Sequence, residues 1–308
     1  MARLPSYRRV YKTIGDQEID VDVYVPSNAN RRPVIINIHG GAFMLGSARM
    51  INQDQVYDCL DRGWIVLAPN HRLCPQVDLL EGPIQDCRDL LAWLHAGALD
   101  DMADLERVFA FGTSSGGTLA MCLGFGVPHP VAGIYSMYGA CNFSHPIWKK
   151  PIPNMRLPTF SDDFLQKIYS ASPVPIEGGV SLEGQATGPP DFTDPRQAFA
   201  LTQIANGKVP ETIYPSQKWV DVDPAENISP GFPPTFIVHG TADTKVPIHL
   251  SRMLYSTLKK HRVLSGMLEA PGEEHTFAAQ MKVGSSTWHI QRQGFDFLES
   301  LMKPRGQA

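Results

Sequence analysis

Several features are missing from the sequence, and each absence narrows the range of functions. No run of Lys and Arg is long enough to follow a phosphate backbone, and the formal net charge of -4 does not favour nucleic-acid binding. No stretch approaches the roughly 20 uninterrupted apolar residues that span a bilayer. Residues 1–6 also lack the apolar segment of a signal peptide. We therefore expect a cytoplasmic protein without a membrane span or a nucleic-acid partner.

Cysteine is scarce, and histidine is dispersed. The odd number of cysteines and the lack of C-x-x-C spacing favour reduced, buried side chains over a disulfide framework or a metal site. The histidines show no H-E-x-x-H or similar ligand spacing, so we expect neither a metal nor a cofactor. The five cysteines are Cys59, Cys74, Cys87, Cys122 and Cys141.

Apolar runs and helical periodicity alternate along most of the chain. The 308 residues are 43% hydrophobic and 19% charged, which is an ordinary globular balance, and we expect one catalytic domain over residues 1–308. Strand and helix alternation of this kind predicts an α/β fold, a mostly parallel doubly wound sheet with helices on both faces. Strands are predicted at 18–25, 33–38, 64–68, 108–111, 131–136, 234–238 and 266–269. Helices are predicted at 51–61, 83–95, 115–122, 247–260 and 286–302.

The alternation fails between about residues 139 and 230, where prolines, glycines and scattered aromatic side chains replace periodic runs. Long insertions of this kind are uncommon unless they serve a function, so we predict a cap over the substrate pocket at about 139–230. Lys149 and Lys150, within this segment, are interpreted as solvated turn residues.

The strongest chemical signal is Phe111-Gly-Thr-Ser-Ser-Gly-Gly117, which places G-x-S-x-G between an apolar strand and a helix. A serine on such a tight turn exposes its hydroxyl, while Gly112 and Gly116 let the strand and the helix come close. The spacing matches neither the phosphate-binding loop nor the dinucleotide loop. We predict that Ser114 is a nucleophile.

A second glycine-rich segment, His39-Gly-Gly-Ala-Phe43, ends an apolar strand. Acyl transfer needs hydrogen-bond donors where negative charge develops on the carbonyl oxygen, and glycines leave backbone amides unobstructed. We predict an oxyanion hole made by the N–H groups of Gly40, Gly41 and Ser115. His39 itself is interpreted as a structural histidine.

The base and the acid are predicted on two later loops. His275 lies in Glu273-Glu-His-Thr-Phe277 after the last strand, and Asp243 lies in His239-Gly-Thr-Ala-Asp243 after the preceding one. Both loops should emerge at the same sheet edge as the serine turn, and the order Ser, Asp, His is that of α/β-hydrolases. We predict that His275 is the general base and that Asp243 orients it. The alternatives for the acid are Asp221, Asp223 and Glu274.

Together these motifs resemble the α/β-hydrolase superfamily, most closely its hormone-sensitive-lipase-like carboxylesterases of the fold-3 type. The resemblance rests on H-G-G-A-F, the serine turn, H-G-T-A-D and E-H-T-F, and it spans nearly the whole chain. It implies a small-molecule ester or lactone as substrate. Two positions depart from the family pattern: the turn reads G-T-S-S-G where aspartate and alanine often flank the serine, and H-G-G-A replaces H-G-G-G. A kynurenine-formamidase-like amidase would show similar motifs.

The same residues are compatible with other outcomes. Lactone opening, thioester release and cyclisation by an internal nucleophile use the same machinery, and the shape of the pocket and its access to water select among them. A ligand receptor would keep the fold without the chemistry, but such relatives generally lack one member of the triad. No pattern decides whether the chain forms a homo-oligomer.

Overall fold

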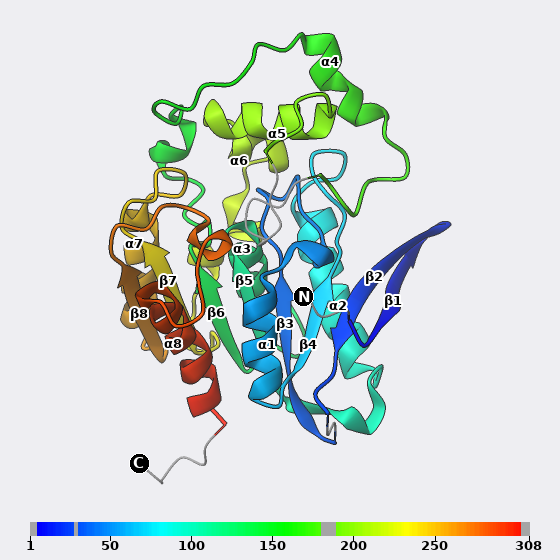
Figure 1. Cartoon of the computed structure of the whole chain (residues 1–308), viewed down its shortest axis with the longest axis vertical. Helices are drawn as coiled ribbons and strands as arrows, with labels where there is room; N and C mark the ends of the chain where they lie inside the picture. Colours follow the sequence, from blue (N-terminus) through cyan, green and yellow to red (C-terminus); the bar gives the residue numbers. More distant parts are fainter. Residues whose placement is uncertain (1–4, 28–29, 180–188, 303–308) are drawn as a thin grey trace.

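One sheet of eight strands organises the part of the chain that the structure, a computed structural model, describes: residues 5–27, 30–179 and 189–302. The strands lie in the order β1-β2-β4-β3-β5-β6-β7-β8 (Figure 1). This arrangement confirms the predicted α/β fold class. In chain order the strands are β1 (Tyr7–Ile14), β2 (Gln17–Tyr24), β3 (Arg32–Ile38), β4 (Ile65–Pro69), β5 (Ala103–Thr113), β6 (Gly133–Met137), β7 (Thr235–Gly240) and β8 (Ser265–Ala270).

Strand direction divides the sheet into two parts. β2 is antiparallel to β1 and to β4, so β1 and β2 form a hairpin at one edge, and all other neighbouring pairs are parallel. Every residue of β4 and β6 is buried, as continuous apolar runs in a sheet covered on both faces require. β5 begins at Ala103, earlier than the predicted start at Val108, because Ala103 pairs with Arg32 of β3 before a register shift, and regular pairing with β3 begins at Val108.

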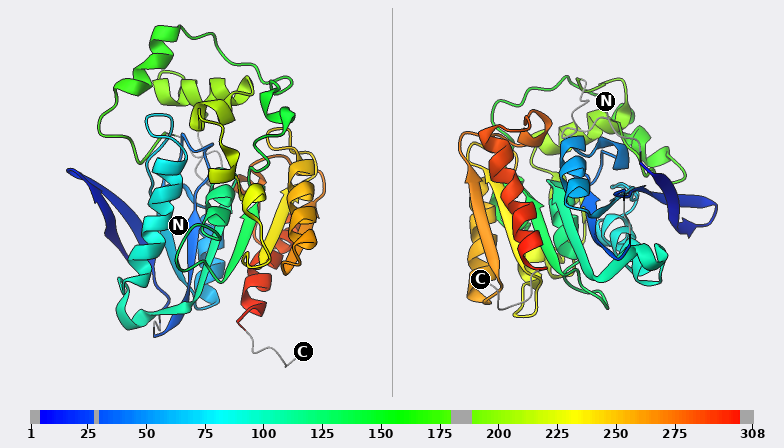
Figure 2. Two further views of the ribbon diagram at one scale, coloured as in Figure 1. Left: turned by 180° about the vertical axis from the view of Figure 1, so that it is seen from behind. Right: turned by 60° about the horizontal axis from the view of Figure 1, so that its bottom comes forward.

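Helices cover both faces of the sheet (Figure 2). Buried residues of α1 and α8 belong to one hydrophobic cluster, and those of α2, α3 and α7 belong to another on the opposite face. No helix in the described ranges is long and apolar enough to cross a membrane. The helices are α1 (Gln53–Asp61), α2 (Gln85–His95), α3 (Ser115–Cys122), α4 (Asp162–Gln166), α5 (Pro195–Ala205), α6 (Val209–Ile213), α7 (Ile248–Lys260) and α8 (Ser286–Ser300).

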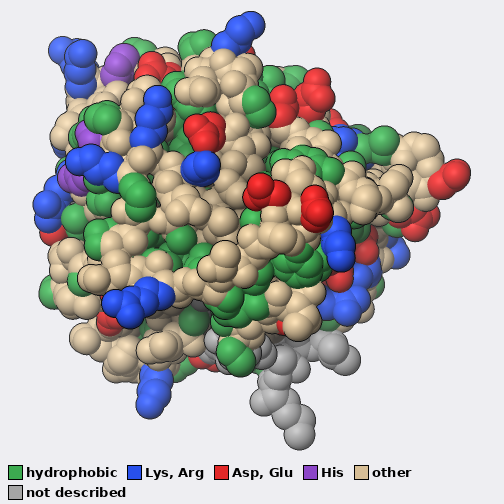
Figure 3. All heavy atoms as spheres, turned by 90° about the horizontal axis from the view of Figure 1, so that it is seen from above, with side chains coloured by type: hydrophobic (Ala, Val, Ile, Leu, Met, Phe, Trp, Pro, Cys, Tyr) green, Lys and Arg blue, Asp and Glu red, His purple; other side chains and the backbone are tan. Residues whose placement is uncertain are grey.

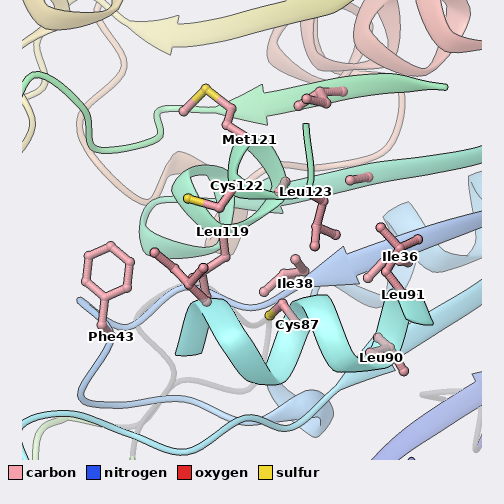
Figure 4. Packing of buried hydrophobic residues seen from close by; sticks show 14 of the residues in the cluster. Ile36, Ile38, Phe43, Cys87, Leu90, Leu91, Leu119, Met121, Cys122 and Leu123 are labelled. Atoms are coloured by element: carbon pink, nitrogen blue, oxygen red, sulfur yellow. The ribbon is translucent and has the colours of Figure 1, made fainter. Parts of the chain in front are cut away.

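The larger cluster includes side chains of β3, which precedes the glycine-rich loop at 39–43, and of α3, which follows the serine turn (Figure 4). Ile36 and Ile38 of β3, Leu90 of α2 and Leu119 of α3 are completely buried in it. Burying one such side chain contributes about 1.5–3 kcal/mol relative to leaving it in water, so the loops are attached to a rigid base. All five cysteines are buried and free, in agreement with the prediction.

The chain between β6 and β7 contains the predicted cap segment and rises above one end of the sheet (Figure 1). α4, α5 and α6 lie in it, together with several short 3₁₀ turns. The sequence did not predict α5, although Asp194 caps its first turn by accepting from the N–H of Arg196, and Pro195 occupies its first position. Residues 180–188 of the predicted cap lie outside the described part of the chain.

Candidate active site

Ser114 lies on the sharp turn between β5 and α3. Its backbone has φ +51° and ψ −122°, a conformation rarely adopted by a residue with a side chain. Close packing around the turn enforces this conformation, because a Cβ atom on Gly112 would collide with the backbone of Gly116, and one on Gly116 with the carbonyl oxygen of Ile38. The N–H of Ser114 donates to the carbonyl of Met137 at 3.0 Å. The serine is thereby held at the end of the sheet.

The structure brings Ser114, His275 and Asp243 into one chain of hydrogen bonds. Oγ of Ser114 lies 2.9 Å from Nε2 of His275, and Nδ1 of His275 lies 2.6 Å from Oδ2 of Asp243. With Nδ1 protonated, the imidazole donates to the carboxylate and accepts from the hydroxyl. The ring of Tyr138 packs edge-on against His275 at 5.0 Å between centroids. This arrangement allows His275 to take a proton from Ser114.

Asp243 is buried and accepts several hydrogen bonds. Oδ1 accepts from the N–H groups of Lys245 and Val246 at 2.9 and 2.8 Å, and Oδ2 also lies 3.1 Å from Nε2 of His239. Burial acts to raise the pKa of Asp243, but His275 and the hydrogen bond from His239 outweigh it and lower that pKa below its ordinary value. Asp243 is therefore suited to remain an anion beside His275.

The glycine-rich loop after β3 turns sharply next to the serine. Gly41 has φ +123°, and its carbonyl accepts from the N–H groups of Met44 and Leu45 at 3.0 and 2.8 Å. Ala42 follows with φ +54°. Gly41, Ala42 and Ser115 all line the cavity beside Ser114. Sequence reasoning missed Ala42, although it occupies the third position after His39 in the same motif.

The remaining predicted donor, Gly40, does not line this cavity. Its carbonyl oxygen lies 2.7 Å from Nδ1 of His39. His39 is buried and stacks on His71, with 4.6 Å between ring centroids, and burial lowers the pKa of His39 to about 3. A neutral, buried imidazole bound to the loop backbone matches the structural interpretation of His39.

A cavity of about 190 Å³ opens at Ser114 and His275. Its floor comes from the sheet edge, and its upper wall comes from the chain between β6 and β7. Apolar side chains form most of the wall, as is usual for small-molecule sites. They are Ala42, Phe43, Ala140, Phe143, Ile147, Trp148, Pro151, Ile152, Pro153, Ile204, Val209, Val246 and Pro247.

The alternative acids occupy other positions. Asp223 accepts from the N–H groups of Asn142 and Phe143 at 3.1 and 2.6 Å and so fastens the start of the cap segment. Asp221 accepts from the hydroxyl of Tyr214 at 3.1 Å. Oε2 of Glu274 accepts from the backbone N–H of His275 at 3.1 Å. Across the described residues, no group of three or more His, Cys, Asp or Glu could hold a metal ion.

Comparison with family models finds two partial matches. Residues 21–131 match a family described as BD-FAE, and residues 192–305 match the prolyl oligopeptidase family. The first range contains the H-G-G-A-F loop and Ser114, and the second contains Asp243 and His275. A doubly wound sheet with these two matches defines a serine hydrolase fold.

Solved structures and curated relatives extend the comparison. A Thermogutta terrifontis esterase 2 structure, phosphonylated by cyclosarin, superposes with a TM-score of 0.66 at 17% identity, covering 99% of this chain and 98% of that one. A Staphylococcus aureus Mu50 protein of unknown function superposes with a TM-score of 0.70 at 19% identity, covering 96% and 99%. At these identities the likeness shows the fold alone. The chain has the α/β-hydrolase fold, and the two partial family matches support a carboxylesterase-like protein of that fold.

The curated relatives are much longer proteins. Non-reducing polyketide synthase Preu6 of Preussia isomera is 30% identical over 316 residues, which cover 94% of this chain. Non-reducing polyketide synthase ausA of Emericella nidulans is 27% identical and also covers 94% of the chain. The match spans only 14% of the length of either synthase.

Proposed function

We propose that this chain is a serine hydrolase that cleaves a carboxylic ester or lactone through an acyl-enzyme. The observation that carries the proposal is the hydrogen-bonded chain from Ser114 through His275 to Asp243, which opens on a largely apolar cavity. The match of residues 192–305 to the prolyl oligopeptidase family supports a serine hydrolase. In this proposal Ser114 is the nucleophile, His275 the general base and Asp243 the orienting acid.

The first half of the reaction forms the acyl-enzyme. Oγ of Ser114 attacks the carbonyl carbon while Nε2 of His275 takes the hydroxyl proton, and Asp243 stabilises the resulting imidazolium. The bond to the leaving oxygen then breaks, and His275 returns the proton to that oxygen. Water attacks the acyl-enzyme in the second half, again assisted by His275, and releases the acid and free Ser114.

Backbone N–H groups stabilise the tetrahedral oxyanion in this mechanism. We retain Gly41 and Ser115 as donors and add Ala42, because all three line the cavity beside Ser114. Gly40 is the weakest of the predicted donors, since it lies outside that lining. Ser115 also begins α3, so the partial positive charge of the helix N-terminus acts at the same place.

The cap segment at about 139–230 would hold the acyl group. Phe143, Ile147 and Trp148 line one part of the cavity, and Ile204 and Val209 line another. Such a wall gains free energy by excluding water from an apolar chain. We propose that this wall, rather than the sheet edge, sets the preferred acyl length.

A second candidate function is release of an acyl chain from a thioester. The observation that favours it is the relationship to polyketide synthases, which covers 94% of this chain for both Preu6 and ausA. The same serine would attack the thioester carbonyl, a thiol would leave, and water or an internal hydroxyl would accept the acyl group. Attack by a hydroxyl group of the acyl chain itself would give a lactone.

Hydrolysis of p-nitrophenyl esters, from acetate to long acyl chains, tests the proposal. Wild-type protein is compared with Ser114→Ala and with Ser256→Ala, a matched control in which an exposed serine of α7 is removed. We expect turnover in wild type and in the control, and none above background in Ser114→Ala. Acyl thioesters of the same chain lengths are assayed in parallel. Turnover that survives in Ser114→Ala would refute the assignment of the nucleophile.

A further inference from the structure

The charged residues that line the active-site cavity are of one sign. Lys150 and Lys245 line it, and none of the Asp and Glu residues that the structure describes does so. The chain as a whole has a formal net charge of -4. Side chains of both signs are scattered over the surface above the cap (Figure 3). The cationic character is therefore a property of the cavity and not of the protein or of that face.

Both lysines lie on backbone that is fixed against the site. Lys245 donates its N–H to Oδ1 of Asp243 at 2.9 Å, two residues after the acid itself. Lys150 lies on the cap side, where a Cβ atom on Gly207 would collide with its carbonyl oxygen and the N–H of Ile152 donates to Ala205 at 2.8 Å. The two lysines thus line one cavity from separate parts of the sequence.

Neither lysine has an anionic partner among the described residues. Two other cations near the core share one acid: Arg72 pairs with Asp86 at 2.8 Å, and Lys12 pairs with the same carboxylate at 2.6 Å. Glu274, beside the base, accepts from the N–H of Thr244 and does not line the cavity. Lys150 is exposed and Lys245 is half-buried, and two lysines without an ion-pair partner beside apolar walls favour a ligand that supplies the negative charge.

We propose that this cavity takes esters or thioesters in which an apolar acyl group is joined to an anionic group, a carboxylate or a phosphate. This substrate class rests on the serine hydrolase function proposed above. The acyl chain lies against the apolar cap wall, while Lys150 and Lys245 bind the anion. The carboxylate would be carried on the acyl chain, and the phosphate on the leaving group.

Matched substrates distinguish the two sources of charge. For the carboxylate, p-nitrophenyl hemiglutarate is compared with p-nitrophenyl valerate. For the phosphate, a pentanoyl thioester of 4'-phosphopantetheine is compared with the same thioester of N-acetylcysteamine. The quantity measured is the ratio of kcat/KM for the anionic substrate to that for its neutral partner. The variants are Lys150→Gln, Lys245→Gln and the double variant, with Lys149→Gln as matched control, since this exposed neighbour does not line the cavity.

We expect one of the two ratios to exceed one in wild type and to fall roughly fivefold for each lysine removed, as for partly exposed ion pairs. The ratio in Lys149→Gln should equal that of wild type. Added salt should reduce the wild-type ratio, because a Debye length of about 3 Å at 1 M screens such charges. If removal of either lysine and addition of salt leave both kcat/KM ratios unchanged, the proposed substrate class is wrong.

Failure of the substrate class and failure of the proposed function give different results. If neutral esters are hydrolysed in a Ser114-dependent way while both ratios stay at one, the hydrolase stands and the anion site fails. If no ester or thioester is turned over, binding of glutarate and 4'-phosphopantetheine to the Ser114→Ala protein is measured by calorimetry. Binding that weakens about fivefold in Lys150→Gln or Lys245→Gln supports the anion site, and unchanged or absent binding refutes it.

Discussion

Nε2 of His239 lies 3.1 Å from Oδ2 of Asp243, the carboxylate oxygen that also faces Nδ1 of His275. His239 is completely buried, and its Nε2 also lies 2.7 Å from the carbonyl oxygen of Val246, while Nδ1 lies 2.8 Å from Oγ of Ser251. Protonation at Nε2 lets His239 donate to both oxygens and accept from Ser251. Asp243, the proposed orienting acid, is thus itself held in position by a second histidine.

Replacing His239 should therefore weaken catalysis through Asp243. We expect His239→Ala to lower kcat roughly tenfold to a hundredfold with a smaller change in KM, because a hydrogen bond to a charged group contributes about 1.5–3 kcal/mol. Steady-state kinetics together with thermal unfolding would measure both effects. Ser251→Ala, which removes only the far partner, serves as comparison. A kcat unchanged in folded His239→Ala would contradict the positioning role.

Removing members of the triad should have unequal effects. By analogy with the best-studied triads, we expect Ser114→Ala or His275→Ala to reduce turnover roughly a million-fold, and Asp243→Asn about ten-thousand-fold through the wrong histidine tautomer. Single-turnover kinetics with an activated ester would measure these losses. Asp221→Asn and Glu274→Gln should each retain most of the activity. Near-normal turnover in Asp243→Asn would transfer the acid role to another residue.

The stability of the protein should depend on pH through Asp223. Burial raises the pKa of Asp223 and outweighs three backbone N–H groups that act to lower it, so this pKa lies at about 6. Because the folded pKa lies above the ordinary value of 3.8, ionisation costs stability as pH rises through about 6. The contribution of this group to the free energy of unfolding should increase by on the order of 2 kcal/mol between pH 7 and pH 4.

Urea denaturation across that pH range would isolate the contribution of Asp223. Other groups titrate there as well, so the quantity of interest is the difference between wild type and Asp223→Asn at each pH. The exposed Asp221→Asn is the matched control, and its pH profile should parallel that of wild type. Parallel profiles for wild type and Asp223→Asn would contradict the raised pKa.

Gly116 should tolerate no side chain. A Cβ atom there would collide with the carbonyl oxygens of Ile38 and His39, which belong to the backbone and cannot move independently of the sheet. We expect Gly116→Ala to cost at least about 1–3 kcal/mol of stability, the usual range for overpacking. Gly231→Ala is the control, because its Cβ atom would meet nothing within 4 Å. Equal melting temperatures for the two variants would show that the serine turn can relax.

Local patterns predicted much of the fold. Continuous apolar runs such as Ile65–Pro69 and helical periodicity over 85–95 depend on neighbouring residues alone, so their elements appear close to the predicted positions. The start of β5 was missed because residues 103–107 are largely polar, and only Ala103 among them pairs with β3, a tertiary contact that the sequence does not record. α5 was missed because proline and glycine around it obscured a capped helix of eleven residues.

The sequence by itself determined the serine turn, because G-T-S-S-G between an apolar strand and a helix is a local pattern with a local geometric requirement. It also placed Asp243 and His275 at strand ends, although their catalytic roles stay predictions. Only the tertiary structure decided that Ala42, and not Gly40, lines the cavity, and that Lys150 and Lys245 do so from sites far apart in the chain. Which residues line the cavity depends on how segments far apart in the sequence approach one another in space. No periodicity or residue spacing in the sequence records that approach.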